Sequence, residues 1–203
     1  MFSSTWPEHL VQIRELFNRL AKANLTVNLA KCEFGKATVT YLGKVVGRGQ
    51  VRPVGAKVEA ICNFPAPSNR RGLRRFLGMV GYYRGFCENF ASVVTPLTNL
   101  LSVKVPFHWT DASQQAFEAA KALLSSAPVL AAPTFEKPFK LAADASDCGA
   151  GAVLLQVGSD GVDHPVCYFS RKFNRHQMVY STIEKEALAL VWAVQYFDVY
   201  LSS

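Results

Sequence analysis

The sequence predicts an α+β fold, and three kinds of observation support this class. Apolar residues recur at helical spacing in several segments before residue 125, and β-branched runs separated by glycine-rich turns interrupt them. Near the end of the chain, three strand-like runs are followed by one long helical segment. Half of the 203 residues are hydrophobic, so the chain is expected to be globular and to bury a core.

The first two elements are expected to be a helix and a β-hairpin. Residues 6–23 carry apolar residues on one helical face, and Thr5 with Glu8 forms a capping box before it. Residues 38–46 and 51–52 are rich in strand-forming residues. The segment 47–50 contains two glycines, which supply the backbone freedom of a hairpin turn between these strands.

A short helix at 56–62 and a proline-marked hinge at 64–67 precede the most unusual helix, expected at 69–86 with Ser68 as its cap. Its first turns contain four arginines, Arg70, Arg71, Arg74 and Arg75. Its interior contains three glycines, Gly78, Gly81 and Gly85. A glycine inside a helix costs about 1 kcal/mol relative to alanine, so either close packing of another helix or close approach of nucleic acid is expected there.

The later segments alternate helices and then strands. Two helices are expected at 90–101 and 112–125, the second capped by Thr110 or Asp111, followed by a proline-marked connector at 127–133. Three strands in hairpin order and a closing helix are then expected at 139–145, 151–157, 165–170 and 182–200.

Charge divides the chain into a basic and an acidic part. Residues 1–105 hold 15 Lys and Arg against 5 Asp and Glu, and residues 106–203 hold 7 against 10. The first part therefore has a net charge of +10 and the second of −3, in agreement with the overall +7. Such a basic part fits contact with a phosphate backbone, and an ordinary solvated basic surface is the alternative.

No apolar stretch is long enough for a membrane span, and no signal-peptide pattern is present, so an intracellular protein without membrane partners is expected. Five widely spaced cysteines form no C-x-x-C pair, which argues against a zinc site or a disulfide framework. No pattern for an organic cofactor is present.

Two carboxylates occupy positions where acids are unusual. Asp144 lies inside a predicted strand, and Glu186 lies on or beside the apolar stripe of the last helix, which is expected to face the sheet. That stripe consists of Ile183, Ala187, Leu190 and Val194. A strand acid and a helix acid could converge on Mg²⁺, and exposed or locally hydrogen-bonded acids are the alternative. In contrast, Glu184 has a structural role in a capping box with Ser181.

An ordered set of motifs over the whole chain resembles the polymerase–RNase H region of gypsy-type long-terminal-repeat retrotransposons. The FLGMVGYYR sequence at 76–84 is similar to the thumb motif of that family, and PLTNLL at 96–101 with Phe107 and Trp109 resembles its connecting segment. The DASDCGAGAVL sequence at 144–154 is similar to the start of its RNase H domain. YFSRK at 168–172 and YSTIEKEALA at 180–189 follow in the same order.

The resemblance implies four regions and a set of site residues. It implies the end of a polymerase palm at 1–63, thumb-like helices at 64–105, a connection helix and tether at 106–136, and an incomplete RNase H-like domain at 137–203. It makes Asp144 and Glu186 the first two metal-binding carboxylates of a ribonuclease H. The nucleic-acid contacts that follow from the arginines, the tyrosines and the resemblance are Tyr41, Leu42, Gly43, Arg70, Arg71, Arg74, Arg75, Gly78, Gly81, Tyr82 and Arg84.

The expected activity of the parent family is RNA-directed DNA synthesis and Mg²⁺-dependent hydrolysis of RNA in RNA–DNA hybrids. The family's polymerase acids should precede residues 2–4, and its third RNase H acid should follow residue 203. We therefore expect weak binding of Mg²⁺ or Mn²⁺, little activity of these residues alone, and possible completion by another Pol chain. The alternatives are a non-catalytic remnant that binds RNA–DNA hybrid or other duplexes, and a decayed reading frame without a selected activity.

Overall fold

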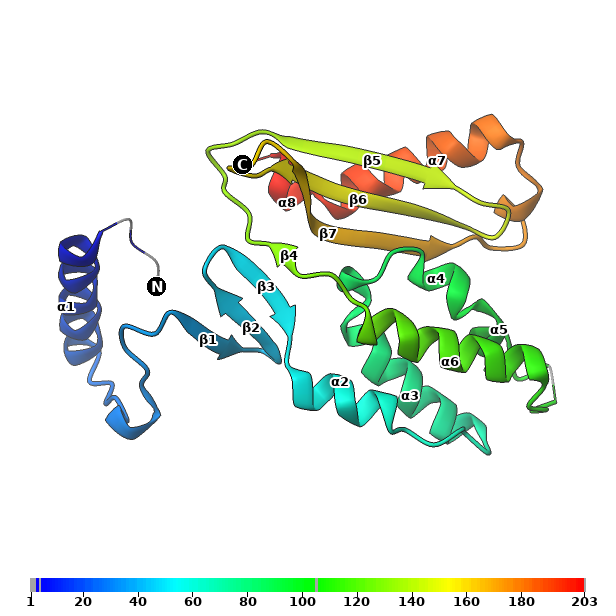
Figure 1. Cartoon of the computed structure of the whole chain (residues 1–203), viewed down its shortest axis with the longest axis horizontal. Coiled ribbons are helices and arrows are strands. Elements are labelled where there is room, and N and C mark those ends of the chain that lie inside the picture. Colours follow the sequence, from blue (N-terminus) through cyan, green and yellow to red (C-terminus); the bar gives the residue numbers. More distant parts are fainter. Residues whose placement is uncertain (1–2, 4, 105, 203) are drawn as a thin grey trace. The chain divides into compact units, whose positions relative to one another are not determined.

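The computed structural model describes residue 3 and residues 5–104 and 106–202, which form two compact units, 1–36 and 37–203 (Figure 1). Residues 2, 4 and 203, which the motif comparison uses as reference points, lie outside the described residues. The α+β class predicted from the sequence is confirmed, with one antiparallel sheet of four strands and another of three. No helix in the described ranges has the length and apolar character that a membrane crossing requires.

The first unit contains helix α1 (Trp6–Lys22) and a 3₁₀ turn, η1 (Leu29–Lys31). The predicted cap is present, because the Thr5 hydroxyl accepts a hydrogen bond from the backbone N–H of Glu8 at 3.4 Å. None of the residues of α1 is buried. The helix is therefore correctly predicted by its apolar periodicity, although that periodicity does not mark a buried face here.

The second unit begins with two successive hairpins, so the prediction of one strand over residues 38–46 was wrong. Strands β1 (Thr38–Tyr41), β2 (Lys44–Gly47) and β3 (Gln50–Pro53) pair antiparallel in order. Their turns are Leu42–Gly43 and Arg48–Gly49, and all four of these residues have positive φ. Two-residue turns with positive φ match the twist of a hairpin, and Leu42 at such a position gave no sequence signal for a turn.

A fourth strand, β4 (Leu130–Ala131), lies in the segment predicted as a connector and pairs with β3. Its register places Ala131 opposite Gln50 and Leu130 opposite Val51. Two residues flanked by prolines are too short for a periodicity signal, because strand recognition needs about four alternating residues. This pairing joins the hairpins to the segment that leads into the second sheet.

The helices between the sheets are α2 (Gly55–Cys62), α3 (Arg70–Tyr82), η2 (Arg84–Phe86), α4 (Phe90–Val93), α5 (Thr95–Asn99) and α6 (Asp111–Ser125). Three predictions need correction. Asn69, not Ser68, caps α3 by accepting from the Gly72 N–H, and Gly85 lies in η2 beyond the end of α3. The helix predicted at 90–101 is divided before Pro96, which cannot continue a backbone hydrogen-bond ladder.

These helices enclose the larger core of the second unit. Phe76 of α3 and Phe117 of α6 pack with their ring centroids 4.5 Å apart, and Trp109 lies 5.8 Å from Phe117. Leu73, Val80 and Leu97 are fully buried in the same cluster. The core fixes α3 with one face inward, which determines the residues that its outer face presents.

The second sheet consists of β5 (Phe139–Ala145), β6 (Gly149–Val157) and β7 (Asp163–Lys172), in the predicted hairpin order. The register between β6 and β7 shifts at Leu154 and Leu155, where Val166 has no opposing residue. Pro165 has no N–H for the ladder, which is consistent with a bulge at this point. Strand β5 is the outer strand of this sheet among the described residues.

Helix α7 (Thr182–Tyr196) packs on β5 and β6, and the short α8 (Asp198–Leu201) follows it (Figure 1). The predicted capping box of Ser181 and Glu184 is confirmed, and hydrogen bonds from the Ser181 backbone and hydroxyl lower the pKa of Glu184. The predicted inward stripe was wrong. Ala189, Trp192 and Ala193 face the core, while Ile183 and Leu190 are 81% and 52% exposed.

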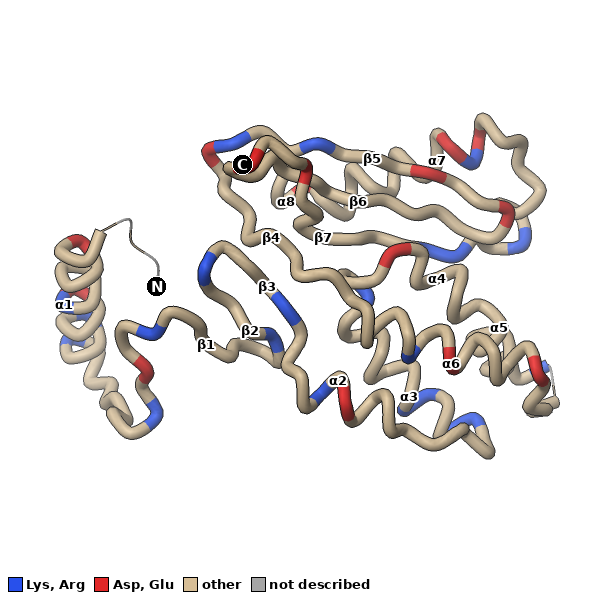
Figure 2. Tube along the Cα trace, viewed as in Figure 1, with Lys and Arg blue, Asp and Glu red and all other residues tan. Residues whose placement is uncertain are grey.

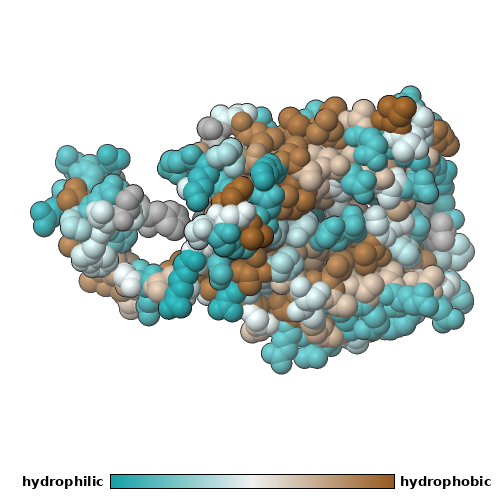
Figure 3. Space-filling model, turned by 45° about the horizontal axis from the view of Figure 1, so that its top comes forward, coloured by the Kyte–Doolittle hydropathy of each residue, from teal (hydrophilic) through white to brown (hydrophobic). Residues whose placement is uncertain are grey.

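The error has a physical reason, because α7 is apolar around most of its circumference and its periodicity does not select one face. Apolar side chains on the upper part of the second unit, the side where α7 lies, are visible on the surface in Figure 3.

Candidate nucleic-acid interface and carboxylate pair

The outer face of α3 carries three kinds of residue that could contact a polyanion. Positions spaced three and four apart along the helix, Arg71, Arg74, Gly78, Gly81 and Tyr82, share this face, opposite the buried Leu73, Phe76 and Val80. Arg71 and Arg74 are exposed and form no ion pair with any described residue. We refer to these five residues as the outer face of α3.

The glycines of this face are not required by packing within the described chain. A Cβ atom built on Gly78 or Gly81 would meet no atom within 4 Å. In contrast, a Cβ on Gly85 would lie 3.2 Å from the Cys167 Sγ, so Gly85 allows η2 to pack on β7. The packing explanation thus applies to Gly85 and fails for the other two glycines.

Two tyrosines at the end of α3 hold the turn between β1 and β2. The Tyr83 hydroxyl donates to the carbonyl oxygen of Gly43 at 3.1 Å, and the Tyr82 hydroxyl donates to the carbonyl oxygen of Leu42. Tyr83 is buried, and its burial together with neighbouring Tyr82 raises its pKa, which keeps the hydroxyl protonated as a donor. As predicted, one tyrosine of this pair belongs to the core.

The hydroxyl of Tyr83 is expected to stabilise the second unit by about 1 kcal/mol. Tyr83→Phe leaves the ring in the core but removes the donor for the Gly43 carbonyl, and a typical hydrogen bond contributes roughly 0.5–1.5 kcal/mol. Urea unfolding followed by circular dichroism measures the change. Tyr180→Phe is a matched control, since Tyr180 is exposed and lies outside this pair; equal effects of the two substitutions would contradict the assigned role.

The hairpin residues held by these tyrosines are accessible. Tyr41 and Leu42 are exposed, and Leu42 occupies the left-handed backbone region with φ of 45°. A β-turn with a leucine at this position carries some strain, because the region favours glycine and asparagine. The predicted contact segment Tyr41, Leu42 and Gly43 is therefore an exposed turn fixed to the end of α3.

The remaining predicted basic contacts have partners inside the protein. The Arg70 guanidinium donates to the carbonyl oxygens of Leu100 and Ser102, both at 3.2 Å, which ties the start of α3 to the end of α5. The Arg75 guanidinium lies 5.8 Å from the ring centroid of Phe64. Burial raises the pKa of the Cys167 thiol. Arg84, in η2, has a smaller effect in the opposite direction, because its positive charge lowers this pKa. Arg70 and Arg75 thus have structural contacts in addition to their charge.

Asp144 lies on the face of the second sheet that is opposite α7. Alternation along β5 places it with Lys140 and Ala142, as predicted, whereas Ala143 and Ala145 pack toward the α7 core. It lines a pocket of about 170 Å³ together with Glu88, Asn89 and Tyr168. Sequence reasoning missed Glu88 and Asn89, because the fold alone brings this segment beside β5 and β6.

Glu186 is half-buried in the second turn of α7. An ion pair fixes its neighbourhood, since the Lys185 Nζ lies 3.5 Å from the Asp147 Oδ1 in the turn that follows β5. The start of α7 and the end of β5 therefore lie at the same end of the sheet (Figure 1). No hydrogen bond joins Asp144 to Glu186, and no group of three or more His, Cys, Asp or Glu is arranged for a metal ion in the described part.

Carboxylate oxygens are suitable ligands for Mg²⁺, which commonly takes one or two protein carboxylates and completes its shell with water or phosphate. Asp144 and Glu186 are of that donor type, and Glu88 lines the same pocket as Asp144 without completing a three-ligand group in the described part. Figure 2 shows basic positions on α3 and the hairpins and acidic positions on β5 and α7, together with further basic positions on β5 and β7 and an acidic position on α2.

Comparison with known proteins is consistent with this architecture. Residues 109–203 match the family described as "RNase H-like domain found in reverse transcriptase". The chain is 42% identical over 202 residues to the retrovirus-related Pol polyprotein from transposon 297 of Drosophila melanogaster, and 36% identical over 201 residues to the transposon Tf2-3 polyprotein of Schizosaccharomyces pombe. These matches cover 99% of this chain but 19% and 15% of the relatives, so the chain spans under a fifth of their length.

The fold also matches solved structures. A foamy viral protease-reverse transcriptase in complex with RNA/DNA hybrid aligns with a TM-score of 0.83 at 23% identity, over 99% of this chain and 27% of that chain. The foamy viral protease-reverse transcriptase dRH in complex with double-stranded DNA aligns with a TM-score of 0.85 at 24% identity, over 99% and 36%. At these identities the likeness establishes the fold alone.

The fold class is α+β with an RNase H-like part of the kind found in reverse transcriptases. Residues 109–203 belong to the family of RNase H-like domains found in reverse transcriptases, and the whole chain is similar to a segment of retrotransposon Pol polyproteins.

Proposed function

We propose that this chain is a duplex-binding part of a reverse transcriptase and that it takes RNA–DNA hybrid. In this proposal residues 1–63 are the end of the palm, 64–105 the thumb, 106–136 the connection and 137–203 the RNase H-like domain. The observation that carries the proposal is the outer face of α3, where an exposed tyrosine lies beside two arginines without ion-pair partners and two glycines without packing contacts among the described residues. Arginines bind phosphates, and glycines let a helix backbone approach a groove closely.

The hairpin supports the same surface. Tyr82 and Tyr83 attach the Leu42–Gly43 turn to the end of α3, so the exposed Tyr41 and Leu42 are held in a defined position relative to the helix. A turn fixed in this way can hold a nucleic-acid end without losing entropy on binding. In the proposal this turn contacts the primer end while α3 lies along the minor groove.

In the second part of the proposal, Asp144 and Glu186 are two acids of a ribonuclease site. When bound there, Mg²⁺ would position a phosphate and activate water for hydrolysis of the RNA strand. Asp144 would supply its carboxylate from β5, and Glu186 from the start of α7, which the Lys185–Asp147 ion pair holds near the end of that strand. Because these two acids fall short of a full set, weak metal binding and little cleavage are expected from the chain alone.

The test is a gel shift with a labelled RNA–DNA hybrid at several salt concentrations, with cleavage followed in the same samples with Mg²⁺ or Mn²⁺. Binding is expected to weaken as salt rises, because phosphate contacts release counterions. Asp144→Asn and Glu186→Gln are expected to leave binding nearly unchanged and to remove any metal-dependent cleavage. Asp198→Asn, in the exposed α8, is the matched control.

Three outcomes separate the possibilities. Salt-dependent binding with cleavage that Asp144→Asn abolishes supports both parts of the proposal. Binding without cleavage leaves the second candidate, a non-catalytic duplex-binding protein. Absence of hybrid binding at low salt would reject the proposal.

A further inference from the structure

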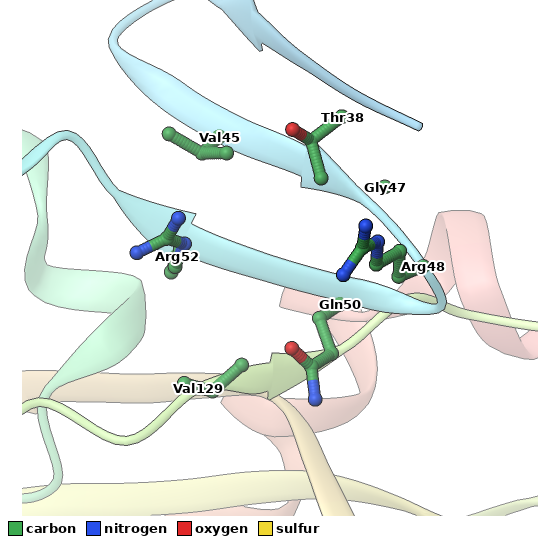
Figure 4. Close-up of a pocket in the computed structure, with 7 residues that line it drawn as sticks. All are labelled: Thr38, Val45, Gly47, Arg48, Gln50, Arg52 and Val129. Atoms are coloured by element: carbon green, nitrogen blue, oxygen red, sulfur yellow. The ribbon is translucent and has the colours of Figure 1, made fainter. Parts of the chain in front are cut away.

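A basic pocket on the β1–β3 hairpins lies outside every site considered so far. It has a volume of about 270 Å³, and its lining residues are Thr38, Val45, Gly47, Arg48, Gln50, Arg52 and Val129 (Figure 4). We call this the hairpin pocket. The register puts Thr38, Gln50 and Arg52 on one face of the sheet, because Thr38 and Gln50 both lie opposite Gly47, and Arg52 lies opposite Val45.

The chemistry of the hairpin pocket suits an anion. Two guanidinium groups, an amide and a hydroxyl can donate hydrogen bonds, and the lining contains no acidic residue. Arg48 and Arg52 form no ion pair with any residue that the structure describes. Guanidinium groups without a carboxylate partner are well suited to bind phosphate oxygens, and Arg48 and Arg52 present two of them from opposite sides of the pocket (Figure 4).

The backbone gives an independent reason to look for a ligand of Arg48. Arg48 has φ of 54° in the turn between β2 and β3, where asparagine or glycine would be favoured. An arginine at this position breaks the local preference, and its side chain lines the pocket and has no ion-pair partner in the described chain. Positions that break a local rule are often functional positions.

Gly47 shapes the floor of the hairpin pocket. A Cβ atom there would lie 2.2 Å from the Ala37 carbonyl oxygen, and the residue has φ of 146°, so only glycine fits. The close approach of β1 to β2 at this residue leaves an open floor between the Thr38 hydroxyl and the two guanidinium groups. The backbone floor of the pocket thus follows from the hairpin geometry, and the exposed side chains of Arg48, Gln50 and Arg52 form its rim.

We propose that the hairpin pocket binds a backbone phosphate of nucleic acid through Arg48 and Arg52. This inference rests on the proposed function, because it takes the phosphate from the same nucleic acid that contacts α3. It adds a further anchoring point, at the β2–β3 turn, to the outer face of α3 and the Leu42–Gly43 turn. Phosphate contacts of this kind position a nucleic acid without reading its sequence.

The test compares the salt dependence of hybrid binding in Arg48→Asn, Arg52→Gln and Arg14→Gln. Each removes one positive charge, and Arg14→Gln, on the exposed surface of α1, is the control for net charge. Asparagine suits the backbone of residue 48, so Arg48→Asn should fold at least as stably as the unaltered chain. Each pocket variant is expected to lower the slope of log K against log salt by about one and to weaken binding about eightfold at 0.1 M salt.

A second measurement separates this inference from the proposed function. Inorganic pyrophosphate is titrated into the ¹⁵N-labelled chain, and the backbone amide signals of Gly47 and Gly49 are followed by NMR. Shifts that Arg52→Gln removes, together with the altered salt slope, support a phosphate site in the pocket. If the unaltered chain binds hybrid but the pocket variants behave like Arg14→Gln, the inference is overturned and the proposed function stands. Pyrophosphate binding without hybrid binding would reject nucleic acid as the source of the phosphate.

Discussion

Phe117→Ala is expected to lower the free energy of unfolding of the second unit by about 3–5 kcal/mol, the usual range for removing a large buried ring. Phe117 is 1% exposed, and its ring packs against Phe76 of α3 and Trp109. The substitution leaves a cavity among the closely packed members of this core. Urea unfolding measured by circular dichroism and tryptophan fluorescence tests the value.

Phe117→Ala also tests whether the core supports the proposed interface on α3. Phe76 lies on the inner face of α3, so loss of its partner should loosen the helix whose outer face carries Arg71 and Arg74. Val103→Ala is the control, because Val103 is 89% exposed and should change stability by less than about 0.5 kcal/mol. A loss below about 1 kcal/mol for Phe117→Ala would mean that α6 does not support α3 as described.

Local sequence patterns correctly predicted the helices and strands that depend on a single local signal, such as a helix cap or the alternation of a strand. The helix at 111–125, the capping box of Ser181 and Glu184, and the three strands of the second sheet were all predictable, because caps and alternation are local properties. Elements that depend on distant residues were missed. Strand β4 exists because β3 offers it a hydrogen-bonding edge, and the turn at Leu42 depends on the carbonyl contacts of Tyr82 and Tyr83.

The residues of the candidate site also divide into some that local sequence predicts and others that only the fold reveals. The arginines and glycines of α3 were singled out by composition, yet only the fold separates Arg71 and Arg74 from Arg70, whose guanidinium binds two backbone carbonyl groups. Asp144 was singled out because an acid is unusual in a strand. Its neighbour Glu88 was not predictable, because it is far from Asp144 in the sequence. The hairpin pocket was not predictable either, because it depends on how β1, β2 and β3 pair and on Val129, which lies beside β4.

Gly78 and Gly81 provide the strongest test of the α3 interface, because stability and binding should change in opposite directions. A Cβ at either position meets open space in a helical backbone, so Gly78→Ala and Gly81→Ala should each stabilise the second unit by roughly 0.5–1 kcal/mol. A bulkier side chain, such as leucine, should keep much of this gain in stability. If a duplex lies against this face, however, leucine at either position would press into it.

Overpacking costs typically about 1–3 kcal/mol, so Gly78→Leu or Gly81→Leu should raise the Kd for hybrid roughly five- to 150-fold. Gel shifts at fixed salt measure the affinity, and thermal unfolding of the same proteins measures the stability. Ala119→Leu adds the same apolar bulk to the exposed face of α6 and should leave the Kd unchanged. Leucine variants that are more stable and bind hybrid as well as the unaltered chain would show that nucleic acid does not approach this face.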